Sequence, residues 1–295
     1  MPVCPLCLQE NAVDLWIKPK SDPRFSPDES ASYNISSVAA DGSLTIHYCS
    51  ACAFGFNADA PQVETLQAYA DYGDQPEYRI EQDNRIKTAA ALLSALPWGK
   101  EACGRRLLDV GCSVGYYTKA AQDMGYEAVG VEPSRWASDW GAKNLDVRIL
   151  NGSFFDAPIE EGSFDVVLLA DVIEHTSRFK AMLAKAAACL KPEGYLVVLT
   201  PDVGSLAARL LGRRWWSLKP EHVLYFSRRS LAAAIQGAGL KVARMTTAAH
   251  RFSFAYWLFL ATGARAALDR APLRRIPVTL DLRDQLLCLA VKPAA

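Results

Sequence analysis

The stretch Arg106–Tyr117, RLLDVGCSVGYY, decides the fold of this 295-residue chain. An apolar run carries Asp109 near its end, and Gly111 and Gly115 follow within a short turn. This order predicts a buried strand, a glycine turn and then a helix. A turn of this kind commonly holds part of a nucleotide at the N-terminus of the helix. The first question is therefore which nucleotide it holds.

Short apolar strands alternate with helical segments on both sides of this turn. The alternation predicts an α/β fold, with a doubly wound, mainly parallel sheet of seven strands and helices on both faces. Ligands of such sheets bind at the carboxyl ends of the strands. The predicted strands are 106–110, 127–131, 147–150, 164–170, 194–200, 241–247 and 285–292, and the predicted helices are 77–96, 116–124, 134–143, 178–190 and 228–238.

The residues around the turn favour S-adenosylmethionine (SAM) over a dinucleotide. Tyr116 stands where the dinucleotide pattern GxGxxG has its third glycine. The carboxylate of Asp109 would repel a pyrophosphate but attract an ammonium group, and SAM carries an ammonium group and no phosphate. Gly111 and Gly115 lack Cβ, so the backbone can approach the methionine part. Glu132, which ends the next strand, can accept both ribose hydroxyls, a feature that fits NAD equally well.

With these motifs the chain resembles class I SAM-dependent methyltransferases over about residues 78–247, and strand 285–292 also fits. Residues 107–134 resemble the first motif of the family, its helix and the acidic end of its second strand. NGSFFDAP at 151–158 resembles the loop that frames adenine. FDVVLLADVIEHT at 164–176 and LKPEGYLVVLTP at 190–201 resemble the fourth and fifth strands.

The resemblance implies a set of SAM-binding residues. Ser113 departs from the family by replacing a commoner glycine, and Ser153 stands where an Asp is frequent, which puts the contact with adenine N6 in question. The implied contacts are Asp109, Gly111, Ser113 and Gly115 for the methionine end, Glu132 for the ribose, Ser153 and Phe154 for adenine, and Ala170 and Asp171 beside the donor and the acceptor.

Two CxxC pairs distinguish the first 60 residues from the rest. Four thiolates can hold one tetrahedral zinc, and so small a segment lacks the core to fold without such a staple. The alternative is two coincidental pairs in a reduced protein. We predict a zinc-ribbon-like module at 1–60 and a methyltransferase domain at 61–295, with an irregular insert at 250–283. The predicted ligands are Cys4, Cys7, Cys49 and Cys52.

This combination is also similar to bacterial methyltransferases with a zinc-binding leader, some of which act on sugars or other secondary metabolites. Residues 170–175 read ADVIEH and lack the Asn/Asp-Pro-Pro-aromatic motif of amide and base-amine methyltransferases, so an oxygen or carbon acceptor is favoured. An oxygen acceptor profits from a general base. His222 and His175 are the candidates, although His175 could instead brace a helix and His222 could bond only to backbone.

His222 lies in WWSLKPEHVLYFS at 215–227, which we expect to cover the acceptor pocket. Its aromatic residues could stack on a ring or sugar face of the acceptor, or form a packed lid. They are Trp215, Trp216, Tyr225 and Phe226.

The composition limits the partners. Lys and Arg together number 32, as do Asp and Glu, and this balance disfavours nucleic acid. The opening MPVC does not resemble a signal peptide, and the apolar run 252–262 is too short to span a bilayer, so we expect a cytoplasmic protein.

The insert 250–283 combines aromatic residues with Arg265, Arg270, Arg274 and Arg275. It could dock on a membrane or a lipid-linked acceptor, or pack with a solvated arginine face.

The leading hypothesis is transfer of a methyl group from SAM to an oxygen or carbon of a small molecule, such as a sugar, a glycan or lipid precursor, or a phenolic metabolite. One alternative is an RNA methyltransferase whose zinc module reads substrate shape. Another is a SAM-binding interaction module without turnover.

Overall fold

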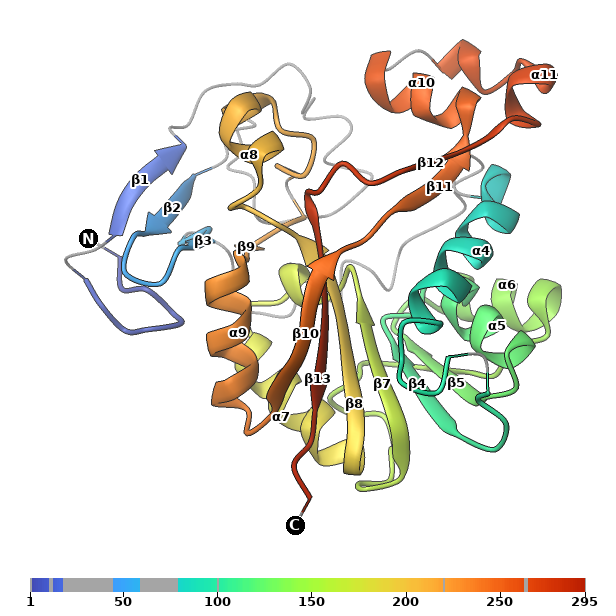
Figure 1. Ribbon diagram of the computed structural model, residues 1–295, viewed down its shortest axis with the longest axis horizontal. Coiled ribbons are helices and arrows are strands. Elements are labelled where there is room, and N and C mark those ends of the chain that lie inside the picture. The colour runs from blue at the N-terminus through green and yellow to red at the C-terminus, as the bar shows by residue number, and fades with distance from the viewer. Residues whose placement is uncertain are drawn as a thin grey trace.

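A seven-stranded sheet forms the centre of the protein, as seen in a computed structural model (Figure 1). The structure describes residues 2–10, 13–17, 45–58, 79–99, 101–219, 221–262 and 265–294. The strands, in their order across the sheet, are β10 (Lys241–Thr247), β13 (Gln285–Val291), β8 (Leu190–Pro201), β7 (Phe164–Ala170), β4 (Arg106–Val110), β5 (Glu127–Glu132) and β6 (Ile149–Asn151).

The order in which the chain adds strands to the sheet reverses at β4. From β4 the chain proceeds to β5 and β6 on one side, and then returns to β7 and β8 on the other. All of these neighbours pair in parallel, whereas β13 is antiparallel to both β8 and β10. The doubly wound, mainly parallel sheet predicted from the sequence is thus confirmed. Ligands of open α/β sheets bind where the strand order reverses, so we expect the ligand at the carboxyl ends of β4 and its neighbours.

Helices cover both faces of this sheet (Figure 1). Leu107 and Leu168 pack with α4 and α5 on one face, while Leu108 and Leu169 pack with α7 and α9 on the other, as expected for successive strand residues. The α-helices and 3₁₀ helices (η) of this core are α4 (Gln82–Leu93), α5 (Tyr116–Asp123), α6 (Arg135–Leu145), η1 (Ile173–His175), α7 (Phe179–Cys189), α8 (Leu206–Leu211), η2 (Gly212–Arg214) and α9 (Arg228–Gly237).

A second, four-stranded sheet joins the N-terminal segment to the core. Its order is β1 (Val13–Ile17), β2 (Ile46–Cys49), β3 (Phe54–Phe56) and β9 (Leu224–Tyr225). The first three strands come from the cysteine-containing segment, but β9 belongs to the stretch that contains His222. The predicted boundary at residue 60 lies outside the described residues, as do residues 18–44 between the two CxxC pairs.

The insert at 250–283 is more regular than the sequence analysis expected. β11 (His250–Ser253) and β12 (Pro277–Leu280) form a hairpin that carries α10 (Phe254–Thr262), η3 (Arg265–Ala267) and α11 (Ala271–Arg274). Phe252, Tyr256 and Leu268 form its small core. The carboxylate of Glu81 anchors the insert, because it accepts hydrogen bonds from the Ser253 N–H at 2.8 Å and the Ser253 hydroxyl at 2.6 Å.

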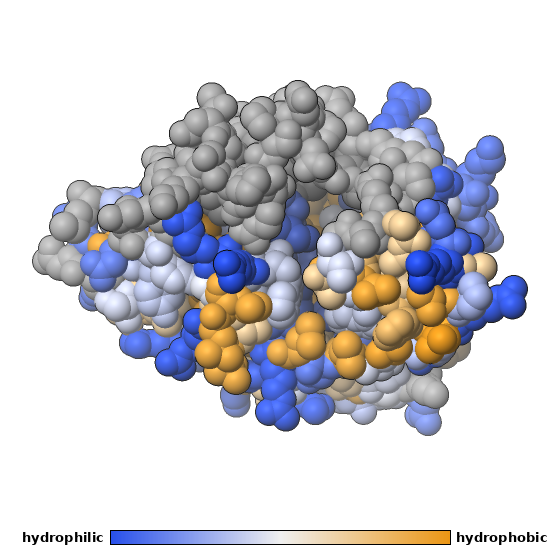
Figure 2. All heavy atoms as spheres, turned by 90° about the horizontal axis from the view of Figure 1, so that it is seen from above, coloured by the Kyte–Doolittle hydropathy of each residue, from blue (hydrophilic) through white to orange (hydrophobic). Residues whose placement is uncertain are grey.

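Exposed apolar side chains remain on this insert and on α8. Phe254, Leu260 and Ile276 are exposed on the insert, as are Leu206 and Leu210 on α8. Seen from above, orange apolar patches lie beside blue hydrophilic ones (Figure 2). Among the described helices, none is long and apolar enough to cross a membrane.

The packing of α6 on the glycine turn generates a stability prediction. A Cβ at Gly141 would lie 2.5 Å from the Val114 carbonyl oxygen, so Gly141→Ala must displace backbone. We expect the free energy of unfolding to fall by about 1–3 kcal/mol in urea titrations. Gly237→Ala, in α9 with nothing within 4 Å, is the control and should gain about 0.5–1 kcal/mol. A Gly141→Ala variant as stable as the parent protein would contradict this packing.

Candidate active site

The turn after β4 requires glycine at two positions. Gly111 and Gly115 have φ of 66° and 87°, in the left-handed region that favours glycine. A Cβ at Gly111 would lie 2.7 Å from Val172 Cγ2, and one at Gly115 would lie 2.9 Å from Val147 Cγ2. The turn is therefore enclosed by the segments that follow β7 and α6. Close packing of the protein itself already explains both glycines, in addition to any approach of a ligand.

Glu132 is fixed at the carboxyl end of β5. It is 6% exposed, and its two carboxylate oxygens accept hydrogen bonds from the Ser113 N–H at 2.8 Å and the Ser134 N–H at 2.9 Å. Burial raises its pKa, while these two hydrogen bonds lower it. Each oxygen keeps a lone pair for a further donor, so the carboxylate can receive two hydroxyl groups. Ser113 adopts φ of 51° in making this contact.

Asp109 lies beside the glycine turn as a buried carboxyl group. It is 2% exposed, and burial raises its pKa to about 7, although a hydrogen bond from the Thr118 hydroxyl at 2.8 Å lowers it. A cation in this place would favour the ionised carboxylate. Thr118 was not predicted from the sequence. It is a polar residue on the inner side of the helix that follows the turn, where it is fully buried, and this position could have identified it.

Ser153 and Phe154 follow β6. Phe154 is 4% exposed and belongs to the main core, where the Lys185 ammonium lies 5.2 Å from its ring centre. The Ser153 hydroxyl accepts a hydrogen bond from the Phe155 N–H at 3.2 Å, and its carbonyl accepts one from the Ala157 N–H at 2.9 Å. These bonds shape the loop locally. A contact of either residue with adenine stays a prediction.

Ala170 and Asp171 stand at the carboxyl end of β7, next to the glycine turn. Leu169 pairs with Val110 in the parallel register, so the two residues that follow it lie level with the start of the turn. Asp171 is exposed and has φ of 54°, and its N–H donates to the Leu199 carbonyl at 2.9 Å. Its backbone is thus fixed at the carboxyl end of β7.

The two candidate bases lie against each other. The ring centres of His175 and His222 are 4.7 Å apart with the planes at 84°. His175 Nδ1 lies 2.9 Å from the Glu221 carbonyl oxygen, which can only accept, so Nδ1 carries the proton and Nε2 is the acceptor nitrogen of the neutral ring. Burial lowers the pKa of His175 and lowers that of His222 well below its usual value. Both rings are therefore neutral at pH 7.

Glu174 completes this cluster and was not singled out from the sequence. It is 1% exposed, and one carboxyl oxygen accepts a hydrogen bond from the Thr200 hydroxyl at 3.0 Å. Its other oxygen and His222 Nδ1 have no hydrogen-bond partner among the described residues. Burial, and then Asp171, raise the pKa of Glu174 well above its usual value. Together with His175, the cluster offers ligand atoms within 4.8 Å of one another, suited to receiving a proton or a cation.

Most aromatic residues of 215–227 are interior residues. Trp215, Tyr225 and Phe226 are at most 1% exposed, whereas Trp216 is 45% exposed. The packed-lid alternative therefore holds for the first three. Trp216 alone of these four offers a substantial exposed ring surface.

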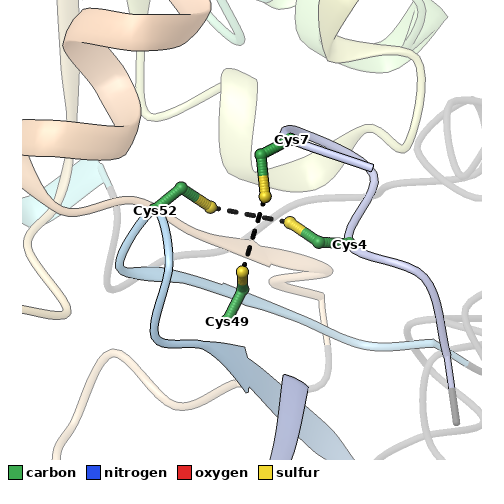
Figure 3. Close-up of side chains that lie close together, drawn as sticks. All are labelled: Cys4, Cys7, Cys49 and Cys52. Carbon is green, nitrogen blue, oxygen red and sulfur yellow. Dashed lines mark hydrogen bonds between the residues drawn. The ribbon is translucent and has the colours of Figure 1, made fainter. Parts of the chain in front are cut away.

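The four cysteines of the two CxxC pairs come together, with their sulfur atoms pointing toward one another (Figure 3). The Sγ atoms of Cys4 and Cys52 are 3.6 Å apart, as are those of Cys7 and Cys49. Zinc bonded tetrahedrally to four sulfurs at about 2.3 Å requires separations of about 3.8 Å, so the cluster fits zinc. Burial raises the pKa of Cys4 to about 11, so this thiol is protonated at pH 7 when no metal is bound. A bound dication would lower the pKa and favour the thiolate.

A comparison with protein families gives the class of this fold and site. The family described as methyltransferase domain matches residues 78–244. This range is more than half of the chain and includes the glycine turn, Glu132 and the histidine cluster. The chain belongs to this family of SAM-dependent methyltransferases.

Curated relatives of this chain include O-methyltransferases of ubiquinone biosynthesis. The one from Bradyrhizobium sp. (strain ORS 278) is 31% identical over 157 residues, which cover 51% of this chain and 52% of the relative. The one from Rhodopseudomonas palustris (strain BisB18) is 36% identical over 106 residues, covering 33% and 40%. The chain thus spans about half the length, or less, of these two relatives.

Solved structures support the fold. A SAM-dependent methyltransferase from Archaeoglobus fulgidus has a TM-score of 0.52 at 18% identity, and the match covers 74% of this chain and all of the other (100%). The [4+2]-cyclase SpnF has a TM-score of 0.51 at 18% identity, covering 71% and 81%. The same fold therefore also serves a cyclase, so the reaction must be inferred from the site.

Asp109→Asn tests the donor half of the site. Asp109 is predicted to face the SAM ammonium, so loss of its buried charge should raise the SAM Kd at least about tenfold in calorimetry. In the parent protein SAM should bind more tightly as the pH rises from about 6 to about 7.5, because the carboxyl group ionises near pH 7. The variant should lack this pH dependence.

The exposed Asp123, in the helix that follows the turn, supplies the control. Asp123→Asn should leave the Kd within about twofold of the parent value, since exposed charges away from a ligand contribute little. An unchanged Kd for Asp109→Asn would exclude Asp109 from the donor site.

Proposed function

We propose that the chain transfers the methyl group of SAM to an oxygen of a small molecule. The observation that carries this proposal is the contact between two neutral imidazole rings. His175 follows the end of β7, which lies beside the glycine turn, and His222 packs against His175. A neutral imidazole can take a proton from a hydroxyl group. The names of the curated relatives also support an oxygen acceptor and favour a phenolic metabolite over a sugar or a glycan or lipid precursor.

SAM, when bound, supplies a methyl group on a positively charged sulfur. Asp109 and Glu132 would hold its ammonium and ribose, and Ser153 and Phe154 would flank adenine. His222, whose pKa is lowered by burial, would accept the proton of the acceptor hydroxyl as a neutral imidazole. His175, fixed by the Glu221 carbonyl, would orient His222 as a positioning residue. The acceptor oxygen would gain the methyl group, and the sulfur of SAM would become a neutral thioether.

The other reactions have less support. A carbon acceptor fits the same base. An RNA acceptor would call for a surplus of positive charge, and the chain has 32 basic and 32 acidic residues. A module that binds SAM without turnover would have no use for two neutral imidazoles in contact with each other after β7.

We further propose that residues 1–60 form a zinc-ribbon-like module on a methyltransferase domain at 61–295. One Zn²⁺ would be held by the four cysteines, and the 3.6 Å sulfur separations support it. The metal would act as a structural ion, because four thiolates leave no open position on tetrahedral zinc.

We propose a cytoplasmic location and peripheral membrane contact through 250–283. The exposed side chains of Phe254, Leu260 and Ile276, together with Arg270 and Arg274, support this contact. Nucleic acid is not an expected partner.

His222→Ala tests the base. With phenols, catechols and sugars as acceptors, we expect kcat to fall about 100-fold while the SAM Kd and the zinc content stay unchanged. Added imidazole should restore part of the rate. When kcat of the parent protein is measured against pH, its fall on the acid side should have a midpoint below about pH 6.5. The reason is that burial lowers the pKa of both histidines. An unchanged kcat, or an equal loss of SAM binding, would remove His222 from this role.

Elemental analysis tests whether the four cysteines bind zinc. We expect about one zinc per chain, lost in Cys49→Ser and retained in Cys103→Ser, whose cysteine is exposed and outside the cluster. Since metal binding contributes to folding, the variant that lacks zinc should also unfold at a lower temperature. A parent protein that is stably folded without metal would refute the assignment.

A further inference from the structure

The cysteine cluster and the proposed base are connected through one short strand. β3 pairs with β2 on one edge, where Cys49 is opposite Phe54. On its other edge β3 pairs with β9, where Gly55 is opposite Tyr225 and Phe56 is opposite Leu224. His222 lies two residues before β9. A single layer of backbone hydrogen bonds therefore runs from a cysteine ligand to the segment that carries His222.

The residue after His222 is held from both sides. The Asn57 N–H donates to the Val223 carbonyl at 2.9 Å, and the Val223 N–H donates to the Glu174 carbonyl at 2.9 Å. The first bond comes from the cysteine-containing segment and the second from η1, which contains His175. Val223 thus links the N-terminal strands to the histidine cluster.

Side-chain packing makes this connection stiff. Phe54 is fully buried, with its ring centre 5.0 Å from that of Phe226 and 5.8 Å from that of Phe179 in α7. A Cβ at Gly55 would lie 2.9 Å from the Tyr225 Cβ. The absence of a side chain at Gly55 therefore allows β9 to lie close to β3, and separating the two strands would expose buried aromatic surface.

The donor half is held by other contacts. Asp109 and Glu132 are fixed by Thr118, Ser113 and Ser134, all within 106–134. In the described part of the chain, β9 pairs with no strand but β3, whereas β4 is central in the large sheet. A structural change in the cysteine-containing segment should therefore displace the His222 segment before it affects Asp109 and Glu132.

We propose that the cluster of Cys4, Cys7, Cys49 and Cys52 positions the acceptor half of the site: the metal orders β2 and β3, and β3 holds β9 and His222 in place. The inference rests on the zinc and the base proposed above. It gives the N-terminal module a role in aligning the acceptor, with no contribution to SAM binding.

Amide hydrogen exchange on the 295-residue chain with SAM bound tests this without a known acceptor. Removing the metal, with a chelator or by Cys49→Ser, should speed exchange of the amides at 54–57 and 222–225 by at least about tenfold, as expected for local opening. Exchange at 106–118 and the SAM Kd should stay within about twofold of the parent values. Cys103→Ser is the control and should leave all of these unchanged.

Gly55→Val separates the strand contact from the metal. It retains all four cysteines, so zinc should remain bound, yet exchange at 222–225 should accelerate and the His222 imidazole NMR signals should shift. Unchanged exchange at 222–225 after metal loss would overturn the proposal. So would simultaneous loss of SAM binding, because the metal would then support the whole fold. A failure of His222→Ala to slow turnover would instead remove only the base assignment.

Discussion

The enclosed glycine turn after β4 is the constraint on which the site depends. Gly111 and Gly115 adopt positive φ and leave no space for a Cβ beside Val172 and Val147. The turn can therefore close only when the segments after β7 and α6 are in place. In closing, it directs the Ser113 N–H to Glu132 and leaves Asp109 buried beneath it. The contacts that pack the central sheet around the turn therefore also fix the residues of the predicted donor site.

The acceptor half of the site is defined by buried groups that stay neutral, in contrast to the hydrogen-bonded carboxylates of the donor half. Its histidines are kept neutral by burial, and its neighbouring Glu174 is buried with one oxygen lacking a partner among the described residues. Such groups lower stability unless a ligand or a proton compensates them. The segment that carries His222 is bonded to β3 through β9, to η1 through Val223 and to the residues after β8 through Phe226. The proposed role of the cysteine-containing segment in aligning the acceptor half acts through the first of these contacts.

The sequence predicted what local patterns and spacing determine. The strand, turn and helix at 106–117, the acidic end of β5 and the four-cysteine cluster could be inferred because neighbouring residues or repeated spacing define them. β9, the hairpin of β11 and β12, and the burial of Trp215 could not, because each depends on contacts between residues far apart in the chain. Thr118 and Glu174 were missed since a buried polar residue in a helix or turn looks like any surface residue until its partner is known.

The most direct test of the account follows the methyl group itself. The protein would be incubated with SAM labelled with ¹³C in the methyl group and with a mixture of phenols, catechols and sugars, and the products would be examined by carbon NMR. The account predicts a labelled methyl signal of a methyl ether on a small molecule. A labelled methyl group on nitrogen or carbon, or no transfer by a protein that binds SAM, would contradict it.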